Sequence, residues 1–177
     1  HELIYTGFIR TPLIGISNKI KHNGSSVKIV PEIFSNTSDL YKIKKILRKN
    51  KYSYETADNR GKNIKNSYKR LARNIGLDYS VNIREKLDKF CEKLIEIQFE
   101  CIFSSIKKIL ESNKCDLNST PLIFCGVGGQ YLKAKIKKKK INILNFEDLV
   151  IGEKNLLLKS TFHAPATACA FLVAEKK

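Results

Sequence analysis

The sequence has 177 residues, with 33 basic against 17 acidic side chains and a net charge of +16. This length suffices for one well-packed domain. No apolar stretch approaches the roughly 20 residues of a membrane helix, so we expect a soluble, cytoplasmic protein. Five cysteines without a CxxC pair argue against a disulfide scaffold or a zinc site. The chain starts at His1 and contains no methionine, which indicates a processed or truncated polypeptide.

The excess positive charge comes mainly from lysine. Lysines are concentrated in 42–51, 62–69 and 137–140, where they alternate with polar residues. Scattered lysines are typical of solvated helix faces and turns, whereas specific phosphate recognition favours the planar fork of arginine. Polyanion binding is therefore the weaker interpretation, and we do not expect a nucleic-acid partner.

The N-terminal part predicts short β-strands. Residues 2–9 and 12–16 are β-rich runs, and Pro12 breaks the ladder between them because proline lacks an N–H donor. A turn over 22–26 then precedes another short strand at 27–30. We expect an antiparallel meander here.

Helical spacing begins after this region. Apolar residues within 40–47 predict a helix that is capped by one of the polar residues 35–37 and ends near Arg48. A second amphipathic stretch, 68–75, is ended by Gly76.

The second half of the chain starts with its longest helix. The apolar stripe over 83–109 predicts this helix, with Ser80 or Asn82 as its cap. Strands and helices then alternate: a short buried strand at 121–125, a turn at 126–129, a helix at 130–137, a strand at 141–144 and a helix at 165–175. Such a βαβα series indicates a parallel sheet with crossover helices. The predicted class is α/β, with a mixed sheet and long central helices.

A glycine-rich turn between a predicted strand and helix is the strongest local signal. Gly126, Gly128 and Gly129 would let the backbone approach a ligand, and N–H groups at a helix start complement an anion. The spacing lacks the dinucleotide fingerprint and no Walker lysine follows, so neither a Rossmann nor a P-loop assignment is supported. The alternative is a tight turn that only permits helix-on-sheet packing.

A second candidate site lies in the segment 50–63, which has no apolar periodicity and predicts a loop turned by Asn59 or Gly61. Within it, Asp58 could hold Mg²⁺, and Arg60 and Thr56 could bind a diphosphate. A self-contained Asx-turn with a surface ion pair is the alternative.

Four further polar residues are candidates. Glu32 and Asp39 could project from a strand-to-helix junction, although Asp39 also suits the positive end of the helix dipole. Arg10 and Thr11 stand at the strand break before Pro12, as a solvated pair or as a ligand clamp.

Several of these segments, in this order, carry a family resemblance. They are residues 2–7, 10–12, 32–34, 39–41, 56–60, 70–73, Gln98, 126–129 and 164–168. Together they resemble the second half of the tetrahydromethanopterin-linked C1-transfer pathway proteins of archaea and methylotrophs, which are relatives of the hydantoinase/oxoprolinase group. The resemblance covers nearly the whole chain.

The resemblance implies an actin-like, ribonuclease H-like fold, with residues 1–177 forming an incomplete C-terminal domain. The family's Asp- and Gly-rich phosphate turns in the preceding half are absent here, so activity would need the remainder of the polypeptide. The implied activity joins an aminomethylfuran-methanol diphosphate to γ-glutamyltyramine in methanofuran biosynthesis and releases pyrophosphate. Implied phosphate-binding residues are Arg60, Thr56, Arg10, Thr11, Gly126, Gly128 and Gly129. Asp58, Asp39 or Glu32 would hold Mg²⁺ or take the phenolic proton.

Two other functions stay open at this point. An ATP-dependent small-molecule kinase or a hydantoinase-like hydrolase could use the same fold, because fold does not fix function. A basic, non-catalytic polyanion-binding module is the alternative of another class, and it would bind in a salt-dependent way.

Overall fold

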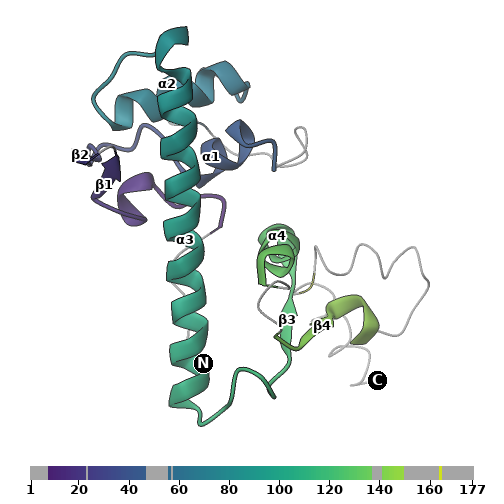
Figure 1. Cartoon of the computed structure of the whole chain (residues 1–177). Helices are drawn as coiled ribbons and strands as arrows, with labels where there is room; N and C mark the ends of the chain where they lie inside the picture. Colours follow the sequence, from purple (N-terminus) through teal and green to yellow (C-terminus); the bar gives the residue numbers. More distant parts are fainter. Residues whose placement is uncertain are drawn as a thin grey trace. The chain divides into compact units, whose positions relative to one another are not determined.

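A computed structural model describes residues 8–22, 24–46, 56, 58–136, 141–149 and 164 (Figure 1). The fold is mixed α/β. Two compact units divide the chain, His1–Ile106 and Lys107–Lys177. One domain over 1–177 stays a prediction, because a compact unit need not be a domain that folds alone.

The first unit contains one β-hairpin. Strands β1 (Lys19–His22) and β2 (Ser25–Lys28) pair antiparallel, and the turn between them lies where the sequence predicts it. Gly24 in this turn has a φ of 75°, a left-handed conformation that glycine adopts without steric cost. The hairpin packs inward through Ile20, which is 2% exposed.

The predicted strand at 12–16 is wrong. Leu13–Gly15 forms a 3₁₀ turn, and Pro12 makes only an isolated antiparallel bridge to Asn36. The side chain of Leu13 is fully buried, so this apolar run contributes to the core although it forms a turn and not a strand. Periodicity cannot separate a strand from a turn over so few residues. Most of the predicted strand at 2–9 lies outside the described residues.

Two short helices follow, and both start where an asparagine caps them. Helix α1 (Thr37–Ile43) begins after Asn36, whose side-chain oxygen accepts the N–H of Ser38 at 3.1 Å. Helix α2 (Ile64–Asn74) begins after Asn63, which accepts the N–H of Asn66 at 2.8 Å. These bonds satisfy donors that have no partner within the helix. α1 and α2 pack against each other.

The helices α1, α2 and α3 (Arg84–Ser112) all end in the same motif. After α2, the N–H of Gly76 donates to Arg73 and that of Leu77 to Ala72, which is the Schellman pattern. Gly76 supplies the left-handed φ of 70° that the pattern needs. After α1 and α3 a lysine takes this position, Lys45 and Lys114, each with φ 55°.

Helix α3, 29 residues long, is the longest helix in the described part of the chain, as predicted. A 3₁₀ turn, Val81–Ile83, leads into it from the predicted cap Ser80. Figure 1 shows the hairpin, α1 and α2 gathered beside its N-terminal portion. Its buried stripe includes Leu87, Phe90 and Leu94, all at most 1% exposed.

Two polar contacts fasten α1 to α3. The hydroxyl of Tyr41 donates to Gln98 Oε1 at 2.5 Å, and the thiol of Cys91 donates to the carbonyl of Leu40 at 3.2 Å. The amide of Gln98 also donates to the carbonyl of Phe8 at 3.3 Å. A fully buried glutamine thus pairs both ends of its amide.

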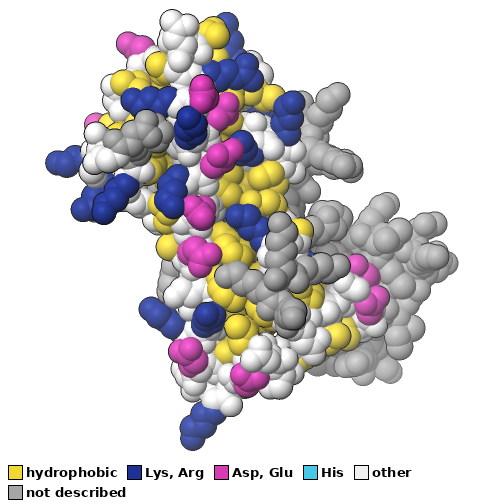
Figure 2. Space-filling model, viewed as in Figure 1, with side chains coloured by type: hydrophobic (Ala, Val, Ile, Leu, Met, Phe, Trp, Pro, Cys, Tyr) yellow, Lys and Arg dark blue, Asp and Glu magenta, His cyan; other side chains and the backbone are white. Residues whose placement is uncertain are grey.

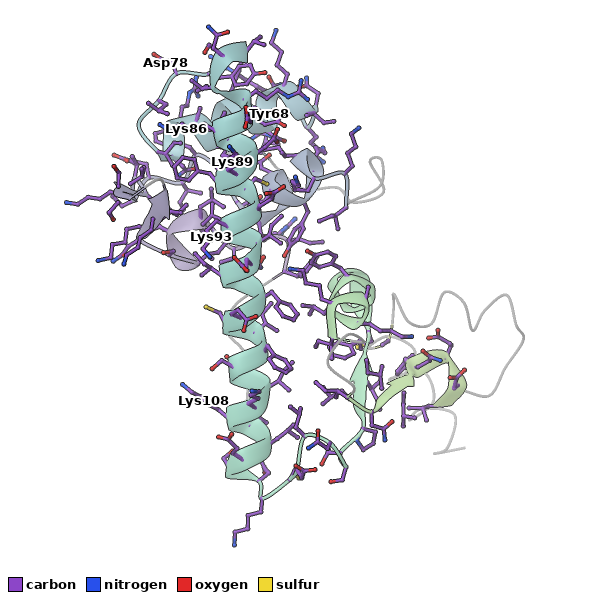
Figure 3. All side chains as sticks on the ribbon, viewed as in Figure 1. Tyr68, Asp78, Lys86, Lys89, Lys93 and Lys108 are labelled. Atoms are coloured by element: carbon purple, nitrogen blue, oxygen red, sulfur yellow. The ribbon has the colours of Figure 1, made fainter. Side chains whose placement is uncertain are left out.

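The lysines along α3 belong to a mixed surface. Figure 3 shows Lys86, Lys89 and Lys93 following one another along the helix, and Figure 2 shows acidic side chains among the basic ones. Lys89 pairs with Glu85 and Lys93 with Glu96, each at 2.8 Å. Such pairs support the interpretation of a solvated helix face.

The second unit contains a parallel strand pair joined by a helix. Strands β3 (Leu122–Phe124) and β4 (Ile143–Asn145) pair in parallel around α4 (Gly126–Ile136), which confirms the predicted βαβ order. The expectation that the first of these strands is buried is wrong, since Ile123 is 46% exposed. The predicted final helix, 165–175, lies outside the described residues. An actin-like arrangement stays a prediction.

None of the helices in the described part of the chain combines the length and the apolar composition that a membrane span requires.

Candidate functional site

The candidate site in the first unit is built around a buried arginine on α2. Arg70 is 1% exposed, and all five of its N–H donors have acceptors. Nε and Nη2 form a fork onto the two oxygens of Asp39, at 2.9 and 2.6 Å. Nη1 donates to Asp58 Oδ1 at 3.0 Å and to the carbonyl of Gly61 at 3.1 Å. One guanidinium therefore joins α1, α2 and the loop before α2.

The carboxylate of Asp39 is saturated. Besides the Arg70 fork, Oδ2 accepts the hydroxyl of Ser35 at 2.9 Å and Oδ1 accepts that of Ser67 at 2.7 Å. A carboxylate has about four acceptor positions, and all four are filled. Asp39 could bind a metal ion or a proton only by giving up one of these bonds, so the geometry favours a supporting role over the predicted catalytic one.

Asp58 is placed differently. Its Oδ1 accepts the backbone N–H of Arg60 at 3.2 Å in an Asx-turn, as well as Arg70 Nη1. The N–H of Asp58 itself also hydrogen-bonds to this carboxylate. The predicted alternative of an Asx-turn is thus present, but its ion pair runs into the core, because the partner is Arg70. The N–H of Arg60 and the guanidinium of Arg70 reach the same oxygen of Asp58.

The environment keeps Asp58 ionised. Burial raises the pKa of this carboxyl, but the N–H of Arg60 and the guanidinium of Arg70 outweigh it, and the pKa lies below its ordinary value. A carboxylate with a lowered pKa suits a cation ligand better than a general base, whose pKa should lie near the working pH.

The turn that carries Asp58 has a left-handed backbone. Asn59 and Gly61 have φ angles of 53° and 81°, which confirms that these residues turn the loop. The N–H of Asn59 donates to the carbonyl of Thr56 at 3.1 Å, and the side-chain amide of Asn66 donates to the carbonyl of Arg60. The Arg60 side chain is exposed. Thr56 therefore belongs to the same turn, and Arg60 is free to reach a ligand.

The other predicted residues of the first unit lie outside this network. Glu32 is exposed, and its carbonyl, rather than its carboxylate, accepts the amide of Asn74 at 3.1 Å. Arg10 is exposed, and the carbonyl of Thr11 accepts the N–H of Thr37 at 2.9 Å at the start of α1. Their roles in binding or catalysis stay predictions.

The glycine-rich segment of the second unit forms the first turn of α4, so the predicted turn at 126–129 is wrong in extent. Gly126 has a φ of 75°. A Cβ added to Gly129 would lie 3.0 Å from the carbonyl carbon of Phe124, tighter than most Cβ contacts, so that the backbone at Phe124 would have to shift by a few tenths of an ångström. Gly129 therefore favours the close packing of α4 on β3. Phosphate contact by Gly126, Gly128 and Gly129 stays a prediction.

Arg70, Ser35, Ser67 and Asn66 are the members of the network that sequence reasoning missed. A usable signal existed on α2, where Ser67, Arg70 and Asn74 share the buried face with Leu71. Polar side chains at helical spacing within an apolar stripe need partners in the core.

A protein metal centre usually needs several histidine, cysteine, aspartate or glutamate side chains close together. Within the described ranges no three of them come together as a ligand set. Among the described residues, Asp58 accepts one side-chain hydrogen bond where Asp39 accepts four. That is compatible with Mg²⁺, which often takes one or two protein carboxylates and completes its shell with phosphate oxygens and water.

The sequence matches no family model. It is similar to two curated proteins of archaea, each named (4-{4-[2-(gamma-L-glutamylamino)ethyl]phenoxymethyl}furan-2-yl)methanamine synthase. The one from Methanocaldococcus jannaschii is 27% identical over 141 residues, which cover 80% of this chain and 42% of that protein. The one from Methanococcus vannielii is 25% identical over 152 residues, covering 84% of this chain and 67% of that protein. The chain therefore spans less than half of the first relative. Both relatives are enzymes by name, which supports an enzymatic role.

Proposed function

We propose that this chain is part of an actin-like transferase that joins an aminomethylfuran-methanol diphosphate to the phenol of γ-glutamyltyramine, as in methanofuran biosynthesis. The similarity to two synthases supports this, because the phenoxymethylfuran in their printed name contains the ether bond that such a reaction forms. The arrangement of Asp58 and Arg60 in one turn is the structural observation that carries the proposal.

The reaction makes one bond and breaks one. The phenolic oxygen attacks the furfuryl CH₂ carbon, the bond from that carbon to the diphosphate oxygen breaks, and pyrophosphate leaves with the bonding electrons. The phenolic proton passes to a base. Catalysis then requires that the leaving group be neutralised and the phenol oriented.

The described residues can supply positive charge that neutralises the diphosphate leaving group. The exposed guanidinium of Arg60 can bind the diphosphate with charge-assisted hydrogen bonds. Asp58 would hold Mg²⁺, and the ion would supply positive charge that stabilises the departing diphosphate. Of the three predicted carboxylates, Glu32 can accept a proton without breaking the Arg70 network, because its side chain is exposed and lies outside it.

The test, made on the full-length protein, is the rate of pyrophosphate release from the two substrates with Mg²⁺ and without ATP. Arg60→Ala should lower this rate about 10- to 100-fold, as expected for a lost hydrogen bond to a charged group. The melting temperature should not change, since Arg60 is exposed. Arg73→Ala on α2 is the matched control and should keep the rate. Formation of ADP instead of pyrophosphate would support the kinase, and equal rates in wild type and Arg60→Ala would remove Arg60 from the site.

A further inference from the structure

The backbone of Arg60 is held at its N–H and at its carbonyl. The N–H donates to Asp58 Oδ1 at 3.2 Å, and the carbonyl accepts the side-chain amide of Asn66, the third residue of α2. The side chain of Arg60 is exposed. A residue whose two backbone groups are both bonded keeps one orientation, and this orientation sets the direction in which its side chain leaves the turn.

The residues on either side of Arg60 make such support necessary. Asn59 has a φ of 53°, which is unfavourable for a residue with a side chain, and Gly61 has a φ of 81°. Glycine adopts other backbone conformations at little cost, so the chain could change direction directly after Arg60. Arg70 holds the carbonyl of Gly61 at 3.1 Å. Among the described side chains, Asn66 is the one that donates to the carbonyl of Arg60 itself.

The side chain of Asn66 is not needed to build α2. The backbone N–H of Asn66 is capped by Asn63 Oδ1 at 2.8 Å, and this bond does not depend on the side chain at position 66. The side chain is half-buried, and alanine is a better helix former than asparagine. Replacing Asn66 by alanine therefore removes the bond to Arg60 and leaves the helix in place.

We propose that Asn66 is a positioning residue that orients Arg60 toward the diphosphate of the substrate. The inference rests on the proposed function in taking Arg60 as the diphosphate-binding group. An arginine side chain loses much rotamer freedom when it binds a ligand. A backbone that is already fixed leaves less freedom to lose, so the bond from Asn66 lowers the cost of binding.

Isothermal titration calorimetry tests this on the full-length protein, with inorganic pyrophosphate as the ligand and without divalent cations. The four forms are wild type, Asn66→Ala, Arg60→Ala and the double variant. Asn66→Ala should weaken pyrophosphate binding about 3- to 10-fold, the size of coupling expected between residues in contact. In the Arg60→Ala background it should add less than a twofold effect, because Asn66 acts through Arg60. The control Asn82→Ala removes an exposed amide before α3 and should bind as wild type does.

Amide hydrogen exchange, measured by NMR without ligand, separates positioning from a general loss of structure. In Asn66→Ala the N–H of Arg60 should exchange faster, while the N–H of the buried Leu71 in α2 should keep its rate. Faster exchange at both residues would mean that α2 itself is destabilised and would overturn the proposal. Asn66→Gln keeps an amide donor and should bind pyrophosphate more tightly than Asn66→Ala; no recovery would also count against the proposal.

Arg60→Ala distinguishes failure of the site from failure of the inference. If Arg60→Ala binds pyrophosphate as wild type does, the proposed function loses Arg60 and the inference falls with it. If Arg60→Ala weakens binding but Asn66→Ala does not, the positioning role is wrong while the site stands. The same conclusion holds if Asn66→Ala causes an equal loss in both backgrounds.

Discussion

Replacing Asp39 by alanine tests how much the buried network contributes to the stability of the first unit. The substitution leaves the Nε and one Nη2 N–H of Arg70 without an acceptor, in a side chain that is 1% exposed. The hydroxyls of Ser35 and Ser67 lose their acceptor as well. Breaking a buried pair by removing one partner costs about 3–5 kcal/mol. Native domains are stable by about 5–15 kcal/mol, so the variant should be close to unfolding.

A matched control exists on the surface. Lys44 pairs with Glu92 at 2.6 Å, the same N···O distance that joins Arg70 to Asp39, but the Glu92 side chain is 60% exposed. Glu92→Ala should cost about 0–1 kcal/mol, because solvent screens an exposed pair. The two variants therefore differ in burial and in the number of hydrogen bonds removed, at equal ion-pair length.

Urea unfolding followed by far-UV circular dichroism measures both free energies, with the slope against urea checked for constancy. Adding Arg70→Met to Asp39→Ala should recover stability, since the uncompensated buried charge is then removed. A cost of Asp39→Ala no larger than that of Glu92→Ala would refute the reasoning.

Three other outcomes are expected. Gly129→Ala should destabilise the packing of α4 on β3 by about 1–3 kcal/mol, because the added Cβ meets backbone at 3.0 Å from Phe124; a thermal melt measures this, and an unchanged melting temperature would contradict it. Cys91 should resist an aromatic disulfide reagent until the protein unfolds, while the exposed thiols react, since burial raises the pKa of the Cys91 thiol and blocks access. Asp58→Asn should lower stability at pH 7. Because the pKa of Asp58 is lowered in the folded state, its contribution is present above the ordinary value of 3.8 and is lost as the pH falls through the folded pKa, so the two unfolding curves should converge in acid; a constant difference down to pH 2 would argue against the Arg70 contact.

Sequence signals close to a helix end were enough to predict where some of the helices start and stop. The polar residues 35–37 marked the start of α1, although the sequence did not single out Asn36 as its cap, and Gly76 marked the end of α2. The end of α1 at Ile43 was placed several residues too late, because Lys45 takes the left-handed position that glycine usually fills. A lysine carries no sequence signal for that role, and its conformation is set by hydrogen bonds to the preceding turn.

The candidate site likewise has one part that the local sequence suggested and another part that it could not predict. The Asx-turn of Asp58 depends on a bond to Arg60, two residues away, and sequence spacing was enough to suggest it. The pairings of Arg70 with Asp58 and Asp39 span 12 and 31 residues, and no local pattern specifies them. Only tertiary packing brings α1 onto α2, so the sequence could suggest that Arg70 is buried but could not identify its partners.

The protonation state of Asp58 constrains how the proposed reaction could work. A phenol has a pKa of about 10, roughly six units above that of a normal aspartate, so proton transfer to such a carboxylate would be uphill by about 8 kcal/mol. Because the pKa of Asp58 is lowered, proton transfer from a phenol to Asp58 would be even less favourable. Catalysis in this turn must therefore come from the departure of the diphosphate, which leaves the furfuryl carbon electron-poor and reduces the demand for a strong base. Because Arg60 would bind charge that develops on the leaving oxygen, its loss should lower kcat more than it raises KM.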